Sequence, residues 1–323
     1  MESAGLVPCV ISDPAQFGAV AVLMGGTAAE RQISLRSGAA VLEALRRKGV
    51  NAVGLDLQDD CVTPLLAGKF DRVFNIIHGR GGEDGVLQGA LESLKIPYTG
   101  SGVLASALGM DKLRTKLCWI ASGLPTPPWM LIANRRDLAL CANRLGFPVI
   151  VKPANEGSSI GMSRAENVSE LEEAWQVASK YNCDVFAEKW VVGKEYTASI
   201  LTDVALPLIR LETPNSFYDF DAKYRSESTR YHCPSGLNAQ DEQALRALAQ
   251  NACRVIGVKG WGRVDFLVDE EANPWLIEVN TVPGMTDHSL VPMAAKAAGL
   301  SFDDLVWRIL ETTFEDFASS SVT

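Results

Sequence analysis

Two short segments near the C-terminal end of the sequence alternate apolar and polar side chains with a period of two. They are residues 262–268 (GRVDFLV) and 274–280 (PWLIEVN). This period predicts two strands, and the turn-forming stretch DEEAN at residues 269–273 predicts that they pair as a hairpin. A hairpin constrains the fold strongly, because its register decides which side chains share a face.

The predicted register brings two acidic side chains together. A symmetric hairpin with a four-residue loop at 270–273 pairs Asp265 with Glu278 and Arg263 with Asn280. Strand side chains alternate between faces, so these four residues share one face of the hairpin. The opposite face then carries the apolar residues Val264, Phe266, Ile277 and Val279.

Two facing carboxylates and an amide oxygen are the hard ligands that Mg²⁺ prefers, and Mg²⁺ commonly completes its shell with substrate phosphates. Asp265, Glu278 and Asn280 are therefore candidate metal ligands. Arg263 could stabilise negative charge that develops in a reaction. The alternative is a solvated polar face with an ordinary cross-strand salt bridge, and the hairpin alone does not decide between the two interpretations.

The first third of the chain alternates strands and helices. Residues 18–24 and 51–57 are predicted strands, and residues 34–48 between them carry leucines at helical spacing. A further strand is predicted at residues 72–78. This order predicts a parallel sheet covered by helices.

The rest of the chain predicts two further modules, so the fold class is mixed α/β in three units. These are an N-terminal α/β domain at residues 1–110, a small central unit at 111–195 and a C-terminal unit at 196–323. The predicted elements of the last two units are strands at 148–152, 184–192, 195–201 and 206–212 and helices at 113–122, 168–180 and 239–256, followed by the hairpin and one C-terminal helix.

Composition limits the classes of partner. The net charge of −9 over 323 residues argues against nucleic acid, because binding to its backbone needs clustered Lys and Arg. The seven cysteines are scattered without a CxxC pair, which fits free thiols in a reducing compartment. No apolar run reaches about 18 residues and no basic secretory start is present, so we expect a cytoplasmic protein without a membrane partner.

Two central segments are candidates for nucleotide binding. Lys152 ends an apolar strand and leads into the loop ANEGSSIG at residues 154–161, whose backbone N–H groups and hydroxyls could face an anion. This loop is neither GxxxxGK(S/T) nor GxGxxG, and alone it reads better as a simple turn. Glu188 and Lys189 interrupt an apolar strand that could offer backbone groups to adenine, or that could simply carry two solvated charges.

The segment at residues 213–234 contains five aromatic residues and no predicted secondary structure. Loops of this length are usually functional or disordered, and the aromatics argue against disorder. We therefore predict a lid that closes over substrates, with a well-packed structural loop as the alternative.

The ends of two N-terminal strands are candidates for a substrate site, because α/β proteins bind ligands at the carboxyl edge of the sheet. Glu30 follows the first strand and could hold a ligand ammonium group, or could cap the following helix. His78 follows the strand at 72–78 and could contact a carboxylate or move a proton. Taken alone, His78 reads better as a structural histidine.

Eight stretches, taken in order, resemble the ATP-grasp superfamily and, within it, the D-alanine–D-alanine ligases. The resemblance covers nearly the whole chain and implies an ATP-grasp fold. The stretches are GGTAAERQISL from Gly25, HGRGGEDG from His78, MDK from Met110, VKPANEGSSIGMS from Val151, AEKWVVGKEYT from Ala187, FYDFDAKY from Phe217, GWGRVDFLV from Gly260 and IEVNTVPGMTDHSLVPM from Ile277.

The resemblance also implies an activity. ATP would phosphorylate the carboxylate of one D-alanine, and the amine of a second would attack the acyl phosphate, giving D-alanyl-D-alanine for peptidoglycan precursors. ATP is the implied co-substrate, with two Mg²⁺ or Mn²⁺ ions, and a homodimer is implied. The alternatives are an ATP-grasp ligase for another acid or acceptor, such as D-lactate, and a non-catalytic ATP-binding regulator.

By the same resemblance, individual residues acquire roles. The nucleotide site would be formed by Lys112, Lys152, Ser158, Ser159, Glu188, Lys189, Trp190, Val191, Glu195 and Lys223. The substrates would be held by Glu30, His78, Arg263, Gly284, Ser289 and Leu290. Ser158 and Tyr224 would join Glu30 through hydrogen bonds that hold the lid closed, and Tyr224 would favour an amine acceptor. The resemblance thus implies a catalytic set of Glu30, Ser158, Tyr224, Arg263, Gly284 and Ser289, with metal ligands Asp265, Glu278 and Asn280.

Overall fold

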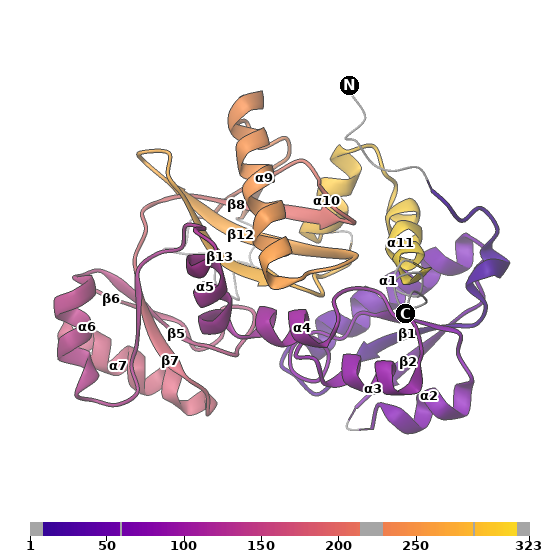
Figure 1. Ribbon diagram of the computed structural model, residues 1–323, viewed down its shortest axis with the longest axis horizontal. Helices are drawn as coiled ribbons and strands as arrows, with labels where there is room; N and C mark the ends of the chain where they lie inside the picture. Colours follow the sequence, from indigo (N-terminus) through magenta and orange to yellow (C-terminus); the bar gives the residue numbers. More distant parts are fainter. Residues whose placement is uncertain (1–8, 59, 214–228, 287, 315–323) are drawn as a thin grey trace.

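The computed structural model describes residues 9–58, 60–213, 229–286 and 288–314, and these ranges form three sheets with their covering helices (Figure 1). The fold is mixed α/β, as predicted. Short 3₁₀ helices occur at Pro14–Phe17, Ser179–Tyr181 and Thr312–Phe314.

The N-terminal sheet is parallel, as the strand–helix alternation predicts. Its central strand β1 (Val20–Gly25) pairs with β2 (Ala52–Leu57) and with β3 (Arg72–Asn75), and α1 (Arg31–Arg47) packs against β1 and β2. Strand β3 ends three residues before the predicted end. The Asn75 side chain accepts a hydrogen bond from the Ile77 N–H at 3.0 Å, which turns the chain out of the sheet.

Four helices occur where the sequence analysis placed no element: α2 (Val62–Gly68), α3 (Val86–Leu94), α4 (Val103–Met110) and α6 (Asp137–Leu145). Each has seven to nine residues. A periodic pattern is hard to distinguish over so few turns, and tertiary packing supplies most of the stability of such helices.

The central sheet is antiparallel and has the order β4-β7-β5-β6. Helices α6 and α7 (Val168–Ala178) pack their apolar residues against those of the strands to form its core. Helix α5 (Lys112–Ala121) leads from the N-terminal unit into this region (Figure 1). The strands are β4 (Trp129–Leu131), β5 (Val149–Pro153), β6 (Ser163–Ala165) and β7 (Val185–Lys189).

The third sheet contains the predicted hairpin and has the order β11-β10-β8-β12-β13, with β9 paired to β8. Helix α9 (Ala239–Ile256) packs on it, and both ends of this helix fall where predicted. The Asn238 side chain caps its start, and Gly257 ends it at a φ of 83°. The strands are β8 (Gly193–Leu201), β9 (Val204–Ala205), β10 (Ile209–Glu212), β11 (Arg230–His232), β12 (Trp261–Asp269) and β13 (Pro274–Asn280).

The hairpin register is correct at the polar pairs and wrong toward the turn. Arg263 pairs with Asn280 and Asp265 with Glu278, but Phe266 pairs with Leu276. Ile277 is therefore an extra residue in β13, a β-bulge. As a result Leu276 is fully buried, whereas Ile277, which was predicted for the apolar face, is only partly buried.

The predicted lid contains one strand, because residues 230–232 form β11 and pair with β10. Tyr231, one of the five aromatics, lies in this strand. Phe217, Tyr218, Phe220, Lys223 and Tyr224 lie outside the described residues.

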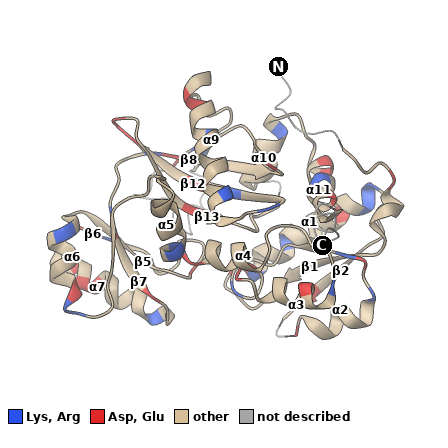
Figure 2. Ribbon diagram, in the orientation of Figure 1, with Lys and Arg blue, Asp and Glu red and all other residues tan. Residues whose placement is uncertain are grey.

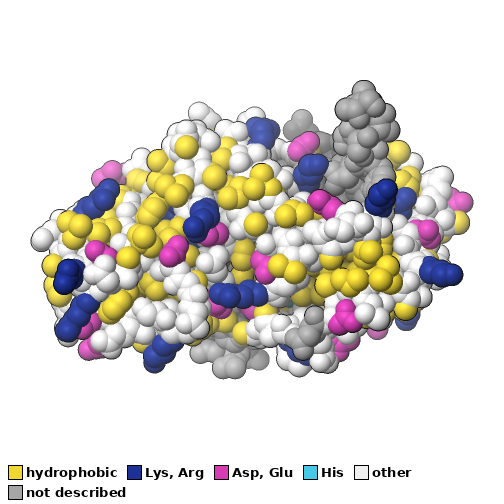
Figure 3. All heavy atoms as spheres, turned by 60° about the horizontal axis from the view of Figure 1, so that its bottom comes forward, with side chains coloured by type: hydrophobic (Ala, Val, Ile, Leu, Met, Phe, Trp, Pro, Cys, Tyr) yellow, Lys and Arg dark blue, Asp and Glu magenta, His cyan; other side chains and the backbone are white. Residues whose placement is uncertain are grey.

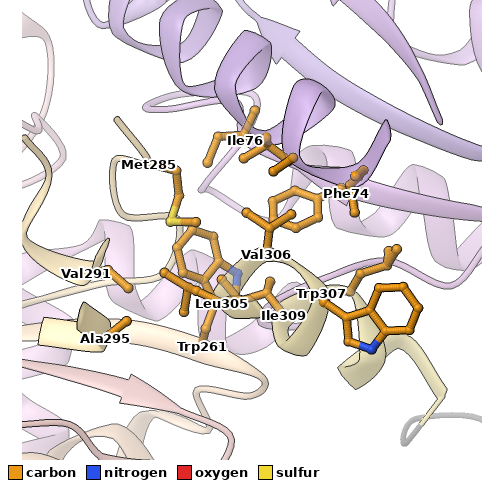
Figure 4. Close-up of a cluster of buried hydrophobic side chains, with 14 of the residues drawn as sticks. Phe74, Ile76, Trp261, Met285, Val291, Ala295, Leu305, Val306, Trp307 and Ile309 are labelled. Atoms are coloured by element: carbon orange, nitrogen blue, oxygen red, sulfur yellow. The ribbon is translucent and has the colours of Figure 1, made fainter. Parts of the chain in front are cut away.

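The N-terminal sheet shares its core with the last two helices, α10 (Leu290–Ala297) and α11 (Phe302–Glu311) (Figure 4). Phe74 and Ile76 lie in the same cluster as Leu305, and the ring of Phe17 meets Trp307 edge-on, with centroids 4.9 Å apart. The first and last parts of the chain are thus packed together. The boundaries at residues 110 and 195 stay a prediction.

Basic and acidic residues are interspersed over the ribbon (Figure 2). Apolar side chains also reach the surface between charged ones on the face shown in Figure 3. Within the described ranges, no helix has the length and apolar character needed to cross a membrane. All seven cysteines are free thiols.

Candidate active site

A cavity of about 930 Å³ brings together side chains from the hairpin, the loop after β5 and the segment before α10. Helices α1, α10 and α11 extend its wall away from the hairpin. Seven residues proposed from the sequence line this cavity: Ser158, Arg263, Glu278, Asn280, Gly284, Ser289 and, at the start of α10, Leu290.

Asp265 is fixed by a network on the polar face of the hairpin. Arg263 donates two hydrogen bonds to its carboxylate, from Nε at 2.8 Å and from Nη2 at 2.7 Å. The Thr197 hydroxyl donates a third at 2.6 Å. Such a bidentate pair holds both side chains in one geometry, so the guanidinium stays close to the cavity that it lines.

Glu278 and Asn280 lie on the same face as Asp265. The Glu278 carboxylate lies 3.5 Å from the Lys112 ammonium, and Asn280 Oδ1 accepts a hydrogen bond from the Val282 N–H at 3.1 Å. Two carboxylates and one amide oxygen, on adjacent antiparallel strands, fit the donor preference of Mg²⁺. Among the described residues no cluster of three or more His, Cys, Asp or Glu could hold a metal, so phosphates or water would have to complete the shell.

A buried ionic cluster lies behind this face. Lys152 Nζ is 3.0 Å from one oxygen of Glu188, and Lys116 Nζ is 2.6 Å from the other. All three side chains are almost fully buried. Lys152 and Glu188 were predicted from the sequence, but Lys116 was not. The one signal for Lys116 is its place four residues after Lys112, on the same helix face.

Burial and neighbouring charges act in opposite directions on this cluster. Burial lowers the pKa of Lys116 to about 8, although Glu188 opposes the shift. Burial alone would raise the pKa of the Glu188 carboxyl, but Lys116 and Lys152 outweigh it and lower that pKa. Glu188 is therefore an anion clamped between two cations, rather than a solvated strand residue.

Glu30 lies where two loops meet. It is 93% buried and occupies the N-cap position of α1, as the alternative expected, but its side chain makes no hydrogen bond that caps the helix. A Cβ added to Gly157 would lie 2.7 Å from Glu30 Oε1, and one added to Gly79 would lie 3.0 Å from Oε2. The carboxylate thus lies between the end of the N-terminal sheet and the loop after β5, and only glycine allows so close an approach.

His78 is buried and its ring is oriented by the segment after β13. Its Nδ1 lies 2.8 Å from the Val282 carbonyl oxygen and 3.4 Å from Glu83. A carbonyl only accepts, so Nδ1 carries the proton in that bond and a neutral ring presents Nε2 as an acceptor. Within the described structure, Nε2 is buried without a hydrogen-bond partner.

The start of α10 is built to face an anion. Ser289 is its N-cap residue, and the Ser289 hydroxyl accepts a hydrogen bond from the Thr286 N–H at 2.9 Å. A Cβ on Gly284 would lie 3.0 Å from the same hydroxyl. The first backbone N–H groups of a helix have no partner inside it, so this end attracts carboxylates.

The strand proposed for adenine already uses some of its backbone donors. The Lys189 N–H donates to Pro128 and the Trp190 N–H to Pro148, at 2.8 and 3.1 Å. Neither N–H is therefore left for a nucleotide, although the Lys189 carbonyl keeps acceptor capacity. The Arg164 guanidinium stacks on the Trp190 ring, 4.8 Å from its centroid.

Other proposed residues lie in three places. Ser158 and Ser159 adopt left-handed backbone angles in the loop after β5, with φ of 53° and 59°. Glu195 lies in β8, opposite Leu267 of β12. Lys223 and Tyr224 are outside the described residues.

Two antiparallel sheets, with a buried lysine on β5, two more on α5 and an oxygen-rich hairpin face, define a protein of the ATP-grasp class. Sequence similarity then identifies the branch of this class. The family model described as the D-ala D-ala ligase C-terminus matches residues 118–311, and the model for the N-terminus matches residues 59–101. The chain belongs to the D-alanine–D-alanine ligase family.

Individual relatives match most of the chain. A protein from Methylococcus capsulatus named D-alanine–D-alanine ligase is 67% identical over 94% of this chain and 98% of its own length. A crystal structure of the Bacillus anthracis ligase has a TM-score of 0.82 at 32% identity, covering 94% of this chain and 99% of that one. A structure of that ligase complexed with ATP has a TM-score of 0.79 at 29% identity, with the same coverage.

Proposed function

We propose that this chain uses ATP to join two D-alanine molecules into D-alanyl-D-alanine for peptidoglycan precursors. The observation that carries the proposal is the position of Glu30. Its carboxylate, suited to a ligand ammonium, lies against Gly157 in the loop that leads from Lys152, the lysine suited to phosphate. An amino acid held by Glu30 would therefore present its carboxylate toward the transferred phosphate.

The nucleotide would be held mainly by charge. Lys112 and Lys152 are the cations that face the phosphates, and the loop at residues 154–161 adds N–H groups. Asp265, Glu278 and Asn280 would hold Mg²⁺, which neutralises the charge of the transferring phosphate when bound. Phosphoryl transfer needs little covalent help from protein, so positioning and charge supply the rate.

The first D-alanine would bind between Glu30 and His78. Glu30 accepts hydrogen bonds from the ammonium of this D-alanine. The carboxylate oxygen of the D-alanine attacks the γ-phosphorus of ATP, which releases ADP and leaves an acyl phosphate. His78 would lie next to the same carboxylate, with its ring oriented by the hydrogen bond to the Val282 carbonyl. Ser158 then acts as a positioning group near Glu30, and Tyr224 is proposed as its partner in the closed lid.

The second D-alanine would bind at the start of α10. The Ser289 hydroxyl and the Leu290 N–H would receive its carboxylate, and its neutral amine would attack the acyl carbonyl carbon. Arg263 and the Gly284 N–H would stabilise the oxyanion that forms. Collapse of this intermediate breaks the bond to phosphate and leaves the dipeptide.

Phosphate release with ATP, Mg²⁺ and D-alanine tests this proposal. We expect turnover that depends on D-alanine, stops when a chelator removes Mg²⁺, and yields D-alanyl-D-alanine by mass spectrometry. Turnover with D-alanine plus D-lactate but not with D-alanine alone would reassign the acceptor. Nucleotide binding without turnover for any acid and amine would favour the regulator alternative.

We also propose a cytoplasmic homodimer. ATP is supplied in the cytoplasm, and the free thiols fit that compartment. Apolar residues of α3 and α4 are exposed next to each other, with Val86 64% and Leu104 71% exposed. Light scattering after gel filtration is expected to give about twice the 34.8 kDa chain mass, and a monomer would contradict the proposal.

A further inference from the structure

The proposed function uses Lys112 and Lys152 but leaves Lys116 without a role. Lys116 is the most buried of the three, with no exposed surface. Its ammonium contacts Glu188, donates to the Thr126 hydroxyl at 2.6 Å and lies 3.4 Å from the Leu276 carbonyl. A lysine fully removed from water is costly, so its retention calls for an explanation beyond packing.

The charges of this region do not balance. Glu188 is one anion between two cations, Lys116 and Lys152. The next acid, Glu278, pairs with Lys112 instead. Among the described residues, one positive charge is therefore left over in this buried cluster, and an entering anion would stabilise it.

Each oxygen of the Glu188 carboxylate contacts a different lysine. Lys116 takes Oε2 from the α5 side, and Lys152 takes Oε1 from β5. Without Lys116 the pair of Glu188 and Lys152 would be neutral. Opening a neutral buried ion pair costs far more than releasing one of two lysines that share a carboxylate.

We propose that Lys116 is a positioning residue of the nucleotide site, which pairs with Glu188 so that the Lys152 ammonium is available to a nucleotide phosphate. This inference rests on the proposed function, because it takes Lys152 as a phosphate ligand. Lys116 itself touches neither the nucleotide nor the amino acids. Thr126 and Leu276 hold it on the far side of Glu188.

A double-mutant cycle tests the proposal. The probe is the ATP analogue AMPPNP with Mg²⁺, whose dissociation constant is measured by calorimetry in wild type, Lys116→Met, Glu188→Gln and the double variant. With Glu188 present, we expect Lys116→Met to weaken binding at least tenfold. In the Glu188→Gln background the same change should weaken it less than twofold, because no carboxylate remains to capture Lys152.

The matched control is Lys180→Met, which makes the same change at an exposed lysine after α7. We expect no change in AMPPNP affinity for this variant. If Lys116→Met weakens AMPPNP binding equally in wild type and in the Glu188→Gln variant, the proposal is overturned. A lysine with a purely structural role would affect the affinity to the same extent in both backgrounds.

If Lys116→Met does not fold, Thr126→Val decides. It keeps every charge and removes one partner of the Lys116 ammonium, so we expect AMPPNP to bind two- to threefold more weakly with an unchanged KM for D-alanine. Unchanged affinity for AMPPNP would overturn the proposal. Calorimetry measures binding and needs no turnover. A wild type that binds AMPPNP but never consumes D-alanine would refute the proposed function, and the role of Lys116 could still be tested by AMPPNP binding.

Discussion

Two regions of this protein use charge in opposite ways. At the contact between α1 and α11, which we call the helix seam, Arg47 pairs with Asp303 at 2.7 Å and Lys48 pairs with Asp304. These side chains are partly exposed, and each cation has at least one anion of its own, since Arg47 also lies 3.9 Å from Glu43. In the buried cluster, Lys116 and Lys152 share Glu188, so positive charge is in excess.

The difference separates charges that accompany a fold from charges that wait for a ligand. Exposed and matched pairs contribute little to stability, because water and salt screen them. Buried and unmatched charges cost stability and are repaid when a ligand of opposite sign binds. Ligand dependence, more than distance, should therefore distinguish the two regions in experiments.

The largest expected effect concerns the acidic face in front of the buried cluster. Glu278→Gln should lower kcat by about 100-fold or more, because it removes a charge from the proposed metal set. Its melting temperature should stay near that of wild type. Glu271→Gln, at an exposed acid in the turn of the same hairpin, is the control and should keep full activity. Wild-type turnover of Glu278→Gln would remove Glu278 from the metal site.

The second effect lies beneath the helix seam. Leu305 is fully buried in α11, in the core shown in Figure 4. Leu305→Ala should lower the free energy of unfolding by about 2–5 kcal/mol, through lost apolar contact and the cavity left behind. Urea denaturation followed by circular dichroism measures it. If Leu305→Ala lowers the free energy of unfolding by less than the substitution of a charged residue of the helix seam does, the ion pairs rather than the packing hold the seam.

The third effect has opposite signs for binding and stability. Lys152→Met should weaken AMPPNP binding by about tenfold, because a phosphate ligand is lost. Without nucleotide its melting temperature should be equal to or higher than that of wild type, since Lys116 and Glu188 remain as a matched pair. Calorimetry and thermal scans on the same samples give both values. A clear loss of stability would show that the cluster is structural.

The smallest effect concerns the seam charges themselves. The hydrogen bonds from Arg47 and Lys48 lower the pKa of Asp303 and Asp304 respectively below the ordinary 3.8. Their contribution to stability is therefore present above pH 3.8 and is lost as pH falls through the lower pKa of the folded state. Asp303→Asn should shift the melting temperature at pH 7 by only about 1 °C and reduce its fall in acid. A shift as large as that of Leu305→Ala would contradict the comparison.

Sequence alone anticipated the parts of the fold that local patterns encode. The parallel N-terminal sheet, helix α9 with its caps, and the facing of Asp265 and Glu278 all follow from periodicity and turn residues. The bulge at Ile277 was missed, since symmetric pairing and a bulged pairing place Asp265 opposite Glu278 equally well.

The residues of the candidate site also differ in whether local sequence patterns could predict them. Motif residues such as Glu30, Arg263 and Ser289 were named from local sequence and from resemblance, and their roles stay predictions. Lys116 was missed because its importance depends on burial and on Glu188, which is 72 positions away in the chain and meets it only after folding. Sequence patterns report neighbours along the chain, whereas charge balance depends on neighbours in space.

The core in which the first strands pack against α10 and α11 has a consequence for biosynthesis. The ribosome makes Phe17 and Phe74 long before it makes residues 290–311, which cover them. The N-terminal sheet of the nascent chain therefore keeps an exposed hydrophobic face during elongation. Final closure has to wait for the last helices to emerge. Protection of the growing chain by holding chaperones should therefore matter most for its opening segment.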